Sequence, residues 1–300
     1  MSPRLASALL LAALVPAMIA AQKRVDDDLG RFRAQHEALY VWRGEDVKRL
    51  WPGLHGVMAD VYWLRTVQYF GGQQAYATDK NFDLVYPLTD ITVTLDPRFV
   101  LAYQYGAIFL AEPWPVGAGK ADQAIELLDR GARATGSWRL RQYQGYFIYL
   151  FRQDARAAAD VLMEAAKLPG AAYWLKTMAA DVLMRSNERD LSRQIWKAMY
   201  DQSEPGDAMR NNALVNLRFL EARDSMDVLA TWMQRFEKSN GRRPQSLAEL
   251  ERFAGRPLPV RDPSGTPFEY DGTSGGLWLS RGSSLWRPDP DKKRTTHSIP

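Results

Sequence analysis

The sequence predicts an all-α fold, an α-solenoid of stacked helical hairpins with an N-terminal hydrophobic helix and a small α+β module at the C-terminus. The solenoid is predicted by amphipathic stretches in which small and large apolar residues alternate at spacing i, i+4, i+7. These stretches recur at a step of 34 residues, and a fixed step of this length is typical of repeat architectures. A change to a Gly-, Pro- and Arg-rich composition after residue 238 indicates the separate module.

The N-terminal hydrophobic stretch consists of 17 uncharged residues at positions 5–21, LASALLLAALVPAMIAA. As a helix it would be about 26 Å long, close to the roughly 30 Å of a bilayer core. Residues 1–22 are therefore either an uncleaved signal anchor or a signal peptide, and Pro16 and the small residues Ala20 and Ala21 favour cleavage. We expect a bacterial inner-membrane protein with its body on the periplasmic side or, after cleavage, a soluble periplasmic protein.

Residues 23–97 are expected to form an N-terminal helical cap, with a helix pair between residues 56 and 95. Aromatic residues recur every seven positions in the first of these helices, which predicts a ridge. The ridge residues are Tyr62, Trp63, Tyr69 and Phe70. Packing against the next hairpin is the favoured interpretation, and a partner-binding ridge is the alternative.

Residues 98–238 are predicted to form the repeats, each with a first helix followed by one of the small and large triplets. Gly106 and Gly145 lie in first helices, at positions where two helices would approach closely. The triplets are Ala124, Leu128 and Gly131; Ala158, Leu162 and Ala165; Ser192, Trp196 and Met199; and Met226, Ala230 and Met233.

This pattern resembles tetratricopeptide repeats, helical hairpins of 34 residues with Gly and aromatic positions in the first helix and Pro at the end. Pro97, Pro169 and Pro205 lie in that closing region, where proline cannot continue a helix. The chain departs from the family where EPWPVGAGK lengthens one turn, and where Ala180 and Leu214 replace the glycine. Residues 40–205 also look like a group of uncharacterised membrane-anchored repeat proteins of bacterial envelopes, which implies no activity.

The C-terminal module is predicted at residues 239–280, followed by a disordered tail at 281–300. It should contain a short helix at 246–254, capped by Ser246 with Glu249 three residues later, and a β-hairpin from PFEYD and GLWLS. The order NGRRPQSLAEL to RDPSGTPFEYD is similar to the C-terminal region of the major pseudopilins of type II secretion. Homology of the module, or a shared way of joining a hairpin to a helix, would each explain the likeness.

The composition argues against several functional classes. A net charge of +4, spread evenly, does not indicate a nucleic-acid surface, and a chain without cysteine has no thiolate chemistry. His36, His55 and His297 lack metal-ligand spacing, GAGK at 117–120 lacks the remainder of a phosphate loop, and no G-x-S-x-G motif is present. We therefore predict no catalytic residue, metal or cofactor, and no small-molecule substrate is evident.

The resemblance to tetratricopeptide repeats implies a groove lined by the first helices that binds a protein or peptide partner. Counting along each repeat, the partner-binding residues would be Tyr103, Arg139, Gln142, Tyr146, Tyr149, Trp174, Asp181, Asn211 and Arg218. Aromatic anchors supply buried area and Arg or Asn can fix an extended backbone. The function expected from this is a non-enzymatic membrane-associated scaffold, with a secretion or pilus-type complex as its setting. The alternative is an envelope enzyme or enzyme subunit that uses the repeats as a specificity arm.

Overall fold

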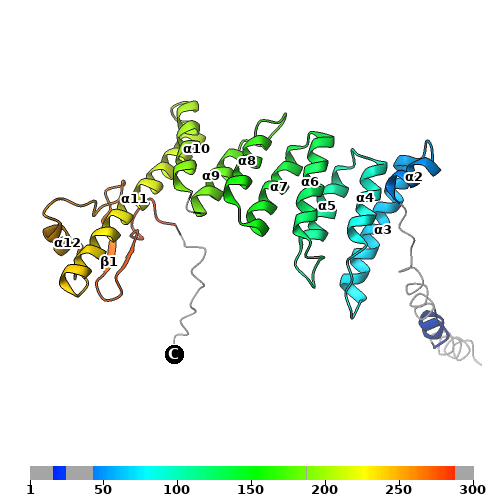
Figure 1. The fold of residues 1–300 in the computed structure, drawn as a ribbon, viewed down its shortest axis with the longest axis horizontal. Helices are drawn as coiled ribbons and strands as arrows, with labels where there is room; N and C mark the ends of the chain where they lie inside the picture. Colours follow the sequence, from blue (N-terminus) through cyan, green and yellow to red (C-terminus); the bar gives the residue numbers. More distant parts are fainter. Residues whose placement is uncertain (1–15, 25–42, 187, 288–300) are drawn as a thin grey trace, which may run out of the picture. The chain divides into compact units, whose positions relative to one another are not determined.

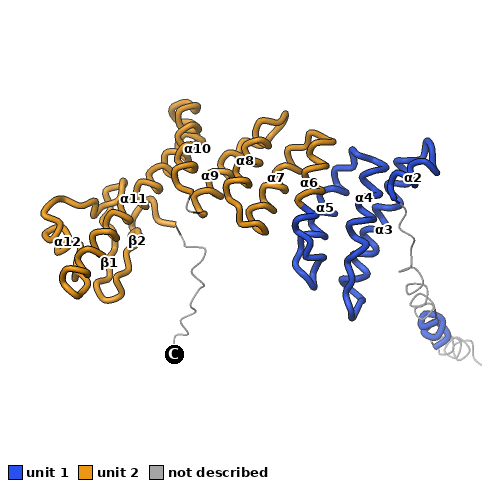
Figure 2. Tube along the Cα trace, viewed as in Figure 1, with its two compact units in different colours: residues 1–124 blue, residues 125–300 orange. Residues whose placement is uncertain are grey.

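A computed structural model describes residues 16–24, 43–186 and 188–287. The described chain is mostly helical and includes a small two-stranded sheet (Figure 1). It divides into two compact units, residues 1–124 and 125–300 (Figure 2). The division falls within helix α6 (Ala121–Thr135), not at the predicted boundary of residues 97 and 98.

Unit 1 contains four complete helices among its described residues from 43 onward: α2 (Gly44–Leu50), α3 (His55–Tyr76), α4 (Val85–Leu95) and α5 (Val100–Ala111). Helix α4 packs against the other three, and apolar side chains of α2, α3 and α4 form a core around Val47, Ala59 and Ile91. The helix pair expected between residues 56 and 95 is therefore present as α3 and α4.

The aromatic residues of α3 mostly pack inside unit 1. Tyr62 and Phe70 are each 8% exposed. Phe70 stacks on Phe109 with 4.0 Å between ring centroids, and Trp63 stacks on the same ring at 6.2 Å. Tyr69 donates a 2.6 Å hydrogen bond to the Asn81 carbonyl. These contacts support the packing interpretation of the ridge.

Proline marks the predicted helix ends. Helix α4 ends one residue before Asp96-Pro97, and the Asp96 carboxylate accepts a hydrogen bond from the backbone N–H of Arg98. The EPWPVGAGK segment is a turn between α5 and α6, in which Lys120 pairs with Asp83 at 2.7 Å. Proline lacks the N–H that a continued helix needs, so these positions separate helices, as expected.

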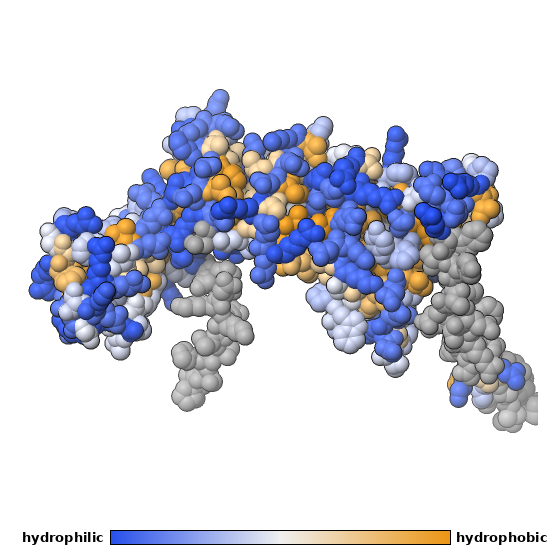
Figure 3. Space-filling view, in the orientation of Figure 1, coloured by the Kyte–Doolittle hydropathy of each residue, from blue (hydrophilic) through white to orange (hydrophobic). Residues whose placement is uncertain are grey.

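Unit 2 begins within α6 and continues through a series of helices, each packed against the next from α7 to α11. They are α7 (Trp138–Phe147) with the π-helical turn η1 (Ile148–Arg152), α8 (Ala155–Ala165), α9 (Leu175–Arg185), α10 (Arg189–Gln202) and α11 (Ala208–Asn240). In the view of Figure 3, hydrophobic residues lie among hydrophilic ones along this unit.

The predicted triplets lie on the buried faces of their helices. The first three triplets, in α6, α8 and α10, are all buried, whereas Met226, Ala230 and Met233 are half-buried. A Cβ on Gly145 of α7 would lie 2.9 Å from the Leu162 side chain and 3.1 Å from the Ala158 carbonyl. The close approach predicted at Gly145 is confirmed, because only a residue without a Cβ fits there unstrained.

Helix α11 differs from the sequence prediction. The 34-residue step predicts two helices between residues 208 and 238, but the structure has one helix of 33 residues. The segment EARDS at 221–225 contains neither Gly nor Pro, so the backbone ladder continues through it. Met226 and Met233 of the fourth triplet instead pack against the core of the C-terminal module, and the prediction of a helical hairpin here is wrong.

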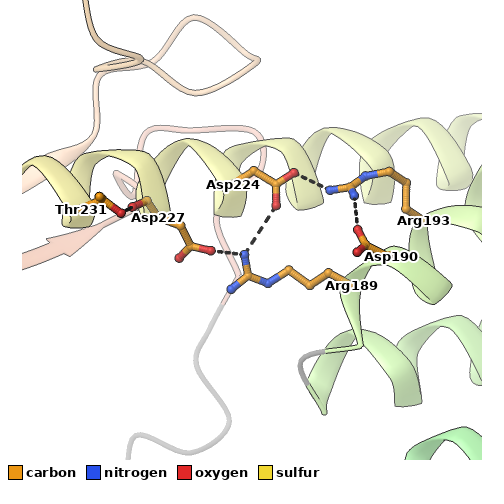
Figure 4. Close-up of polar contacts among 6 residues, drawn as sticks. All are labelled: Arg189, Asp190, Arg193, Asp224, Asp227 and Thr231. Carbon is orange, nitrogen blue, oxygen red and sulfur yellow. Dashed lines mark hydrogen bonds and ion pairs between the residues drawn. The ribbon is translucent and has the colours of Figure 1, made fainter.

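A network of charged side chains joins α10 to α11 (Figure 4). Arg189 approaches Asp224 at 3.5 Å and Asp227 at 2.5 Å, and Arg193 also pairs with Asp224 and lies 2.9 Å from Asp190. Arg189 has only 19% of its side chain exposed, so part of the network is shielded from water. The network holds the middle of α11 against the start of α10.

The C-terminal module has the predicted elements. Helix α12 (Leu247–Ala254) begins after Ser246, whose hydroxyl accepts from the N–H of Glu249, and strands β1 (Glu269–Asp271) and β2 (Gly276–Trp278) pair antiparallel. They pack with the second half of α11 around Leu229, Phe236 and Leu250.

Part of the predicted disordered tail belongs to the module. Leu285 is 2% exposed within the core of the module, and Ser283 donates a hydrogen bond to the Asp262 carboxylate. Apolar contacts and hydrogen bonds thus fix residues 281–287, contrary to the prediction. Residues 288–300, the remainder of that segment, lie outside the described residues.

The predicted N-terminal hydrophobic helix at 5–21 lies largely outside the described residues. Residues 16–24 are described and are helical. Within the described parts of the chain, no helix combines the length and apolar character needed to cross a bilayer.

Candidate functional site

A surface hollow of about 300 Å³ lies between α7 with η1 and α9 in unit 2. Three aromatic side chains, an acid, a base and three smaller or flexible residues surround it. The lining residues are Tyr146, Tyr149, Trp174, Thr177, Met178, Asp181, Val182 and Arg185.

The hollow arises because α7 and α9 are neighbours of the same helix, α8. Both α7 and α9 pack against α8, and residues of both helices line the hollow. Along α9 the lining residues recur every three or four positions, which places them on one face. Leu175, Ala179 and Leu183 are buried on the other side of the helix. Tyr146 and Trp174 remain 40% and 37% exposed, a large area for aromatic side chains.

Asp181 is the half-buried carboxylate of the hollow. Burial raises its pKa above the ordinary value, and the charges of Arg287 and Arg185 lower it only in part. Burial also lowers the pKa of Arg287, against the opposing effect of Asp181. The carboxylate is therefore poorly solvated and incompletely compensated, so a ligand that brings a hydrogen-bond donor or a positive charge would stabilise its ionised form.

Arg287 belongs to the C-terminal segment and acts on Asp181 electrostatically. Its Nη2 donates a 2.9 Å hydrogen bond to Oδ1 of Asn216, and its guanidinium lies 4.5 Å from the ring centre of Phe219, both on α11. The sequence analysis missed this residue because it assigned residue 287 to the tail. No motif around it indicates a contact with residues about 70 positions earlier.

The structure brings together four of the nine residues predicted for the groove: Tyr146, Tyr149, Trp174 and Asp181. Arg139 is exposed near them, with its guanidinium 4.5 Å from the ring centre of Trp138. Trp138 in turn meets Trp174 edge to face, at 6.1 Å between centroids.

The other predicted groove residues do not line the hollow. Gln142 is half-buried on α7, and Asn211 and Arg218 are exposed on α11. Tyr103 is fully buried in α5, so it is not available to a partner. The buried residues of α5 form one broad face that includes Tyr103, whereas Leu101 and Tyr105 on the other side of the helix are exposed, and a count along the repeat does not reveal this.

The lining residues suit binding by contact and hydrogen bonding. Of the eight, none is a histidine, cysteine, serine or glutamate. No group of three potential metal ligands occurs among the described residues. His55, the histidine that the structure describes, forms a 2.9 Å hydrogen bond between Nε2 and the Lys48 carbonyl oxygen.

Comparison with known proteins gives no relative: no family model, curated protein or solved structure matches the chain.

Proposed function

We propose that the chain is a non-enzymatic scaffold of the tetratricopeptide-repeat type, which binds an extended peptide segment of a partner protein in the hollow between α7 and α9. One observation supports this above the others. Tyr146, Tyr149, Trp174 and Asp181 were selected by repeat position alone, and they line one hollow. The repeat count therefore selects residues of one common surface in α7, η1 and α9, although it does not do so in α5, where Tyr103 is buried, or in α11.

The repeat assignment is supported by the buried triplets and by the Gly145 contact. In a helical-hairpin repeat, small and large residues of the second helix contact the first helix, as Ala158 and Leu162 do at Gly145. The first helices α7 and α9 then have a common exposed face, which is the face that such proteins use for peptides.

The chemistry of the hollow favours a peptide with an apolar or aromatic anchor and a neighbouring donor group. Trp and Tyr are the residues that most often supply the energy of a protein interface, because they bury a large area at a low entropy cost. Asp181 can accept hydrogen bonds from peptide N–H groups or from a basic side chain, while Arg185 can donate to a peptide carbonyl.

We further propose that the protein acts at the periplasmic side of a bacterial inner membrane, held there by residues 5–21, in the assembly of a secretion or pilus-type complex. The apolar N-terminal stretch supports the location, and the pseudopilin-like order of the C-terminal module supports the setting. If the N-terminal segment is a cleaved signal peptide, the same scaffold would be a soluble periplasmic adaptor.

Photo-crosslinking in native membranes tests the peptide-binding proposal. Benzoylphenylalanine replaces Tyr149 in the hollow or, as a control, the exposed Asp160 on α8. We expect a defined set of adducts from position 149 alone, and their loss in a Tyr146→Ala, Trp174→Ala background. Tyr173→Ala is the matched control, since Tyr173 is 75% exposed and does not line the hollow. Identical adducts from positions 149 and 160 would contradict the proposal.

A further inference from the structure

A second cluster of aromatic and basic side chains lies in the C-terminal module, on α11, on α12 and just beyond the end of α12. Trp232 has two guanidinium groups within cation–π distance, with Cζ of Arg235 at 4.9 Å and Cζ of Arg256 at 5.3 Å from its ring centre. Phe253 meets Trp232 edge to face at 6.4 Å and is 38% exposed. We call these four residues, together with the exposed Arg252, the Trp232 cluster.

The arginines of the Trp232 cluster form no ion pair with any described residue. Two glutamates of this region are already paired with other arginines, Glu249 with Arg242 at 2.6 Å and Glu237 with Arg243 at 3.6 Å. The Trp232 cluster therefore places three guanidinium groups that form no ion pair with a described residue beside the half-buried Trp232 and the exposed Phe253; Arg252 acts electrostatically on Glu249 without pairing with it.

We propose that the Trp232 cluster is a docking surface for anionic phospholipid headgroups. An exposed guanidinium gains little from a single free anion in water, because solvent and salt screen the pair. A membrane surface presents many anions at once, and each basic residue near it strengthens attachment about fivefold. A partly exposed tryptophan and an exposed phenylalanine beside arginines also suit the headgroup region, where an apolar ring and a charged group are both accommodated.

The Trp232 cluster is separate from the hollow, so either proposal can fail without the other. Failure to crosslink a peptide at position 149 would leave lipid docking untouched. Failure of lipid docking would leave the peptide site untouched.

The test uses the full chain, reconstituted in vesicles, with an environment-sensitive fluorophore on one introduced cysteine. The natural chain has no cysteine, so the label is specific. Ser239→Cys lies one helical turn beyond Arg235 and is exposed; Glu221→Cys, also exposed on α11 and about 27 Å earlier along it, is the control position. The vesicles contain phosphatidylcholine alone, or phosphatidylcholine with phosphatidylglycerol.

We expect a blue shift of the label at position 239 only in vesicles that contain phosphatidylglycerol, reversed by high salt. In the Arg235→Gln, Arg256→Gln variant the phosphatidylglycerol content required for half of the shift should rise markedly, since two arginines together contribute about 25-fold in attachment. Arg223→Gln, which alters an exposed arginine elsewhere on α11, should leave the shift unchanged.

Three results would overturn the proposal. They are no shift with phosphatidylglycerol, an equal shift in phosphatidylcholine alone, and an equal shift in the Arg235→Gln, Arg256→Gln variant. Inorganic phosphate distinguishes the source of the anion: if phosphate alone, without vesicles, changes the label as the lipid does, the cluster binds free anions and the lipid assignment is wrong.

Discussion

Ala158→Arg is the substitution that most directly tests the helix packing of unit 2. Ala158 is fully buried on α8, and its carbonyl oxygen lies 3.1 Å from where a Cβ on Gly145 would be. An arginine here would bring a charge without a partner into a packed interface. An uncompensated buried charge costs about 3–5 kcal/mol, a large part of the 5–15 kcal/mol that stabilises a typical domain.

The assay is urea denaturation followed by far-ultraviolet circular dichroism, since the chain is mostly helical. With a slope near 2 kcal/mol per M, the loss corresponds to a fall in the unfolding midpoint of about 1.5–2.5 M. Gly145→Ala should give a smaller loss, about 0–2 kcal/mol, because an overpacking cost of about 1–3 kcal/mol is offset by about 1 kcal/mol of helix propensity.

Asp160→Arg is the matched control, because Asp160 is exposed on the same helix. It should unfold within about 0.5 kcal/mol of the natural chain, as surface substitutions usually do. If Ala158→Arg and Asp160→Arg unfolded at the same urea concentration, α8 would not bury this face, and the 34-residue register would be wrong.

Two further predictions concern charged groups of unit 2. Burial raises the pKa of Asp181 in the folded chain, so the folded state binds its proton more tightly than the unfolded state, and stability falls as pH rises from the unfolded to the folded pKa. Asp181→Asn should therefore melt at a higher temperature than the natural chain at neutral pH and lose this advantage in acid; an advantage that is the same at every pH would contradict the explanation. Asp224→Asn should destabilise the chain by about 1 kcal/mol through loss of the pairs with Arg189 and Arg193, and the difference in urea midpoint should shrink at high salt, which weakens exposed pairs. A salt-independent difference would show that packing and not charge is lost.

Several features of the fold could be predicted because they depend on local chemistry. Pro97 follows the end of α4 because proline lacks the N–H that a continued helix needs, and Ser246 caps α12 through its own hydroxyl. The triplets could be placed because a helix has a fixed period and a buried face must be small or apolar. Gly145 was informative for the same reason, since its lack of a side chain matters only at a close contact.

The rest depended on contacts between residues distant in sequence. The 34-residue step continued to predict a hairpin where α11 is continuous, because periodicity identifies a helical face but not a turn. Tyr103 was predicted to line the groove from its position in the repeat. That position is at the surface only where the neighbouring helices leave it exposed, and here they bury it. Arg287 could not be placed beside Asp181, because that proximity depends on how the C-terminal segment returns to α11.

The continuity of α11 has a mechanical consequence. Its first half packs on α10 through Ala213 and Leu220, and its second half packs in the module through Leu229 and Phe236, so one rod of about 50 Å belongs to two cores. The direction in which the module faces is then set by helical phase. Inserting one residue near position 223 would turn everything beyond it by about 100°, whereas inserting seven would advance it by about 10 Å with only about 20° of rotation. Lengthening by whole turns would therefore keep the direction in which the module faces, but it would also move Asp224 and Asp227 away from Arg189 and Arg193.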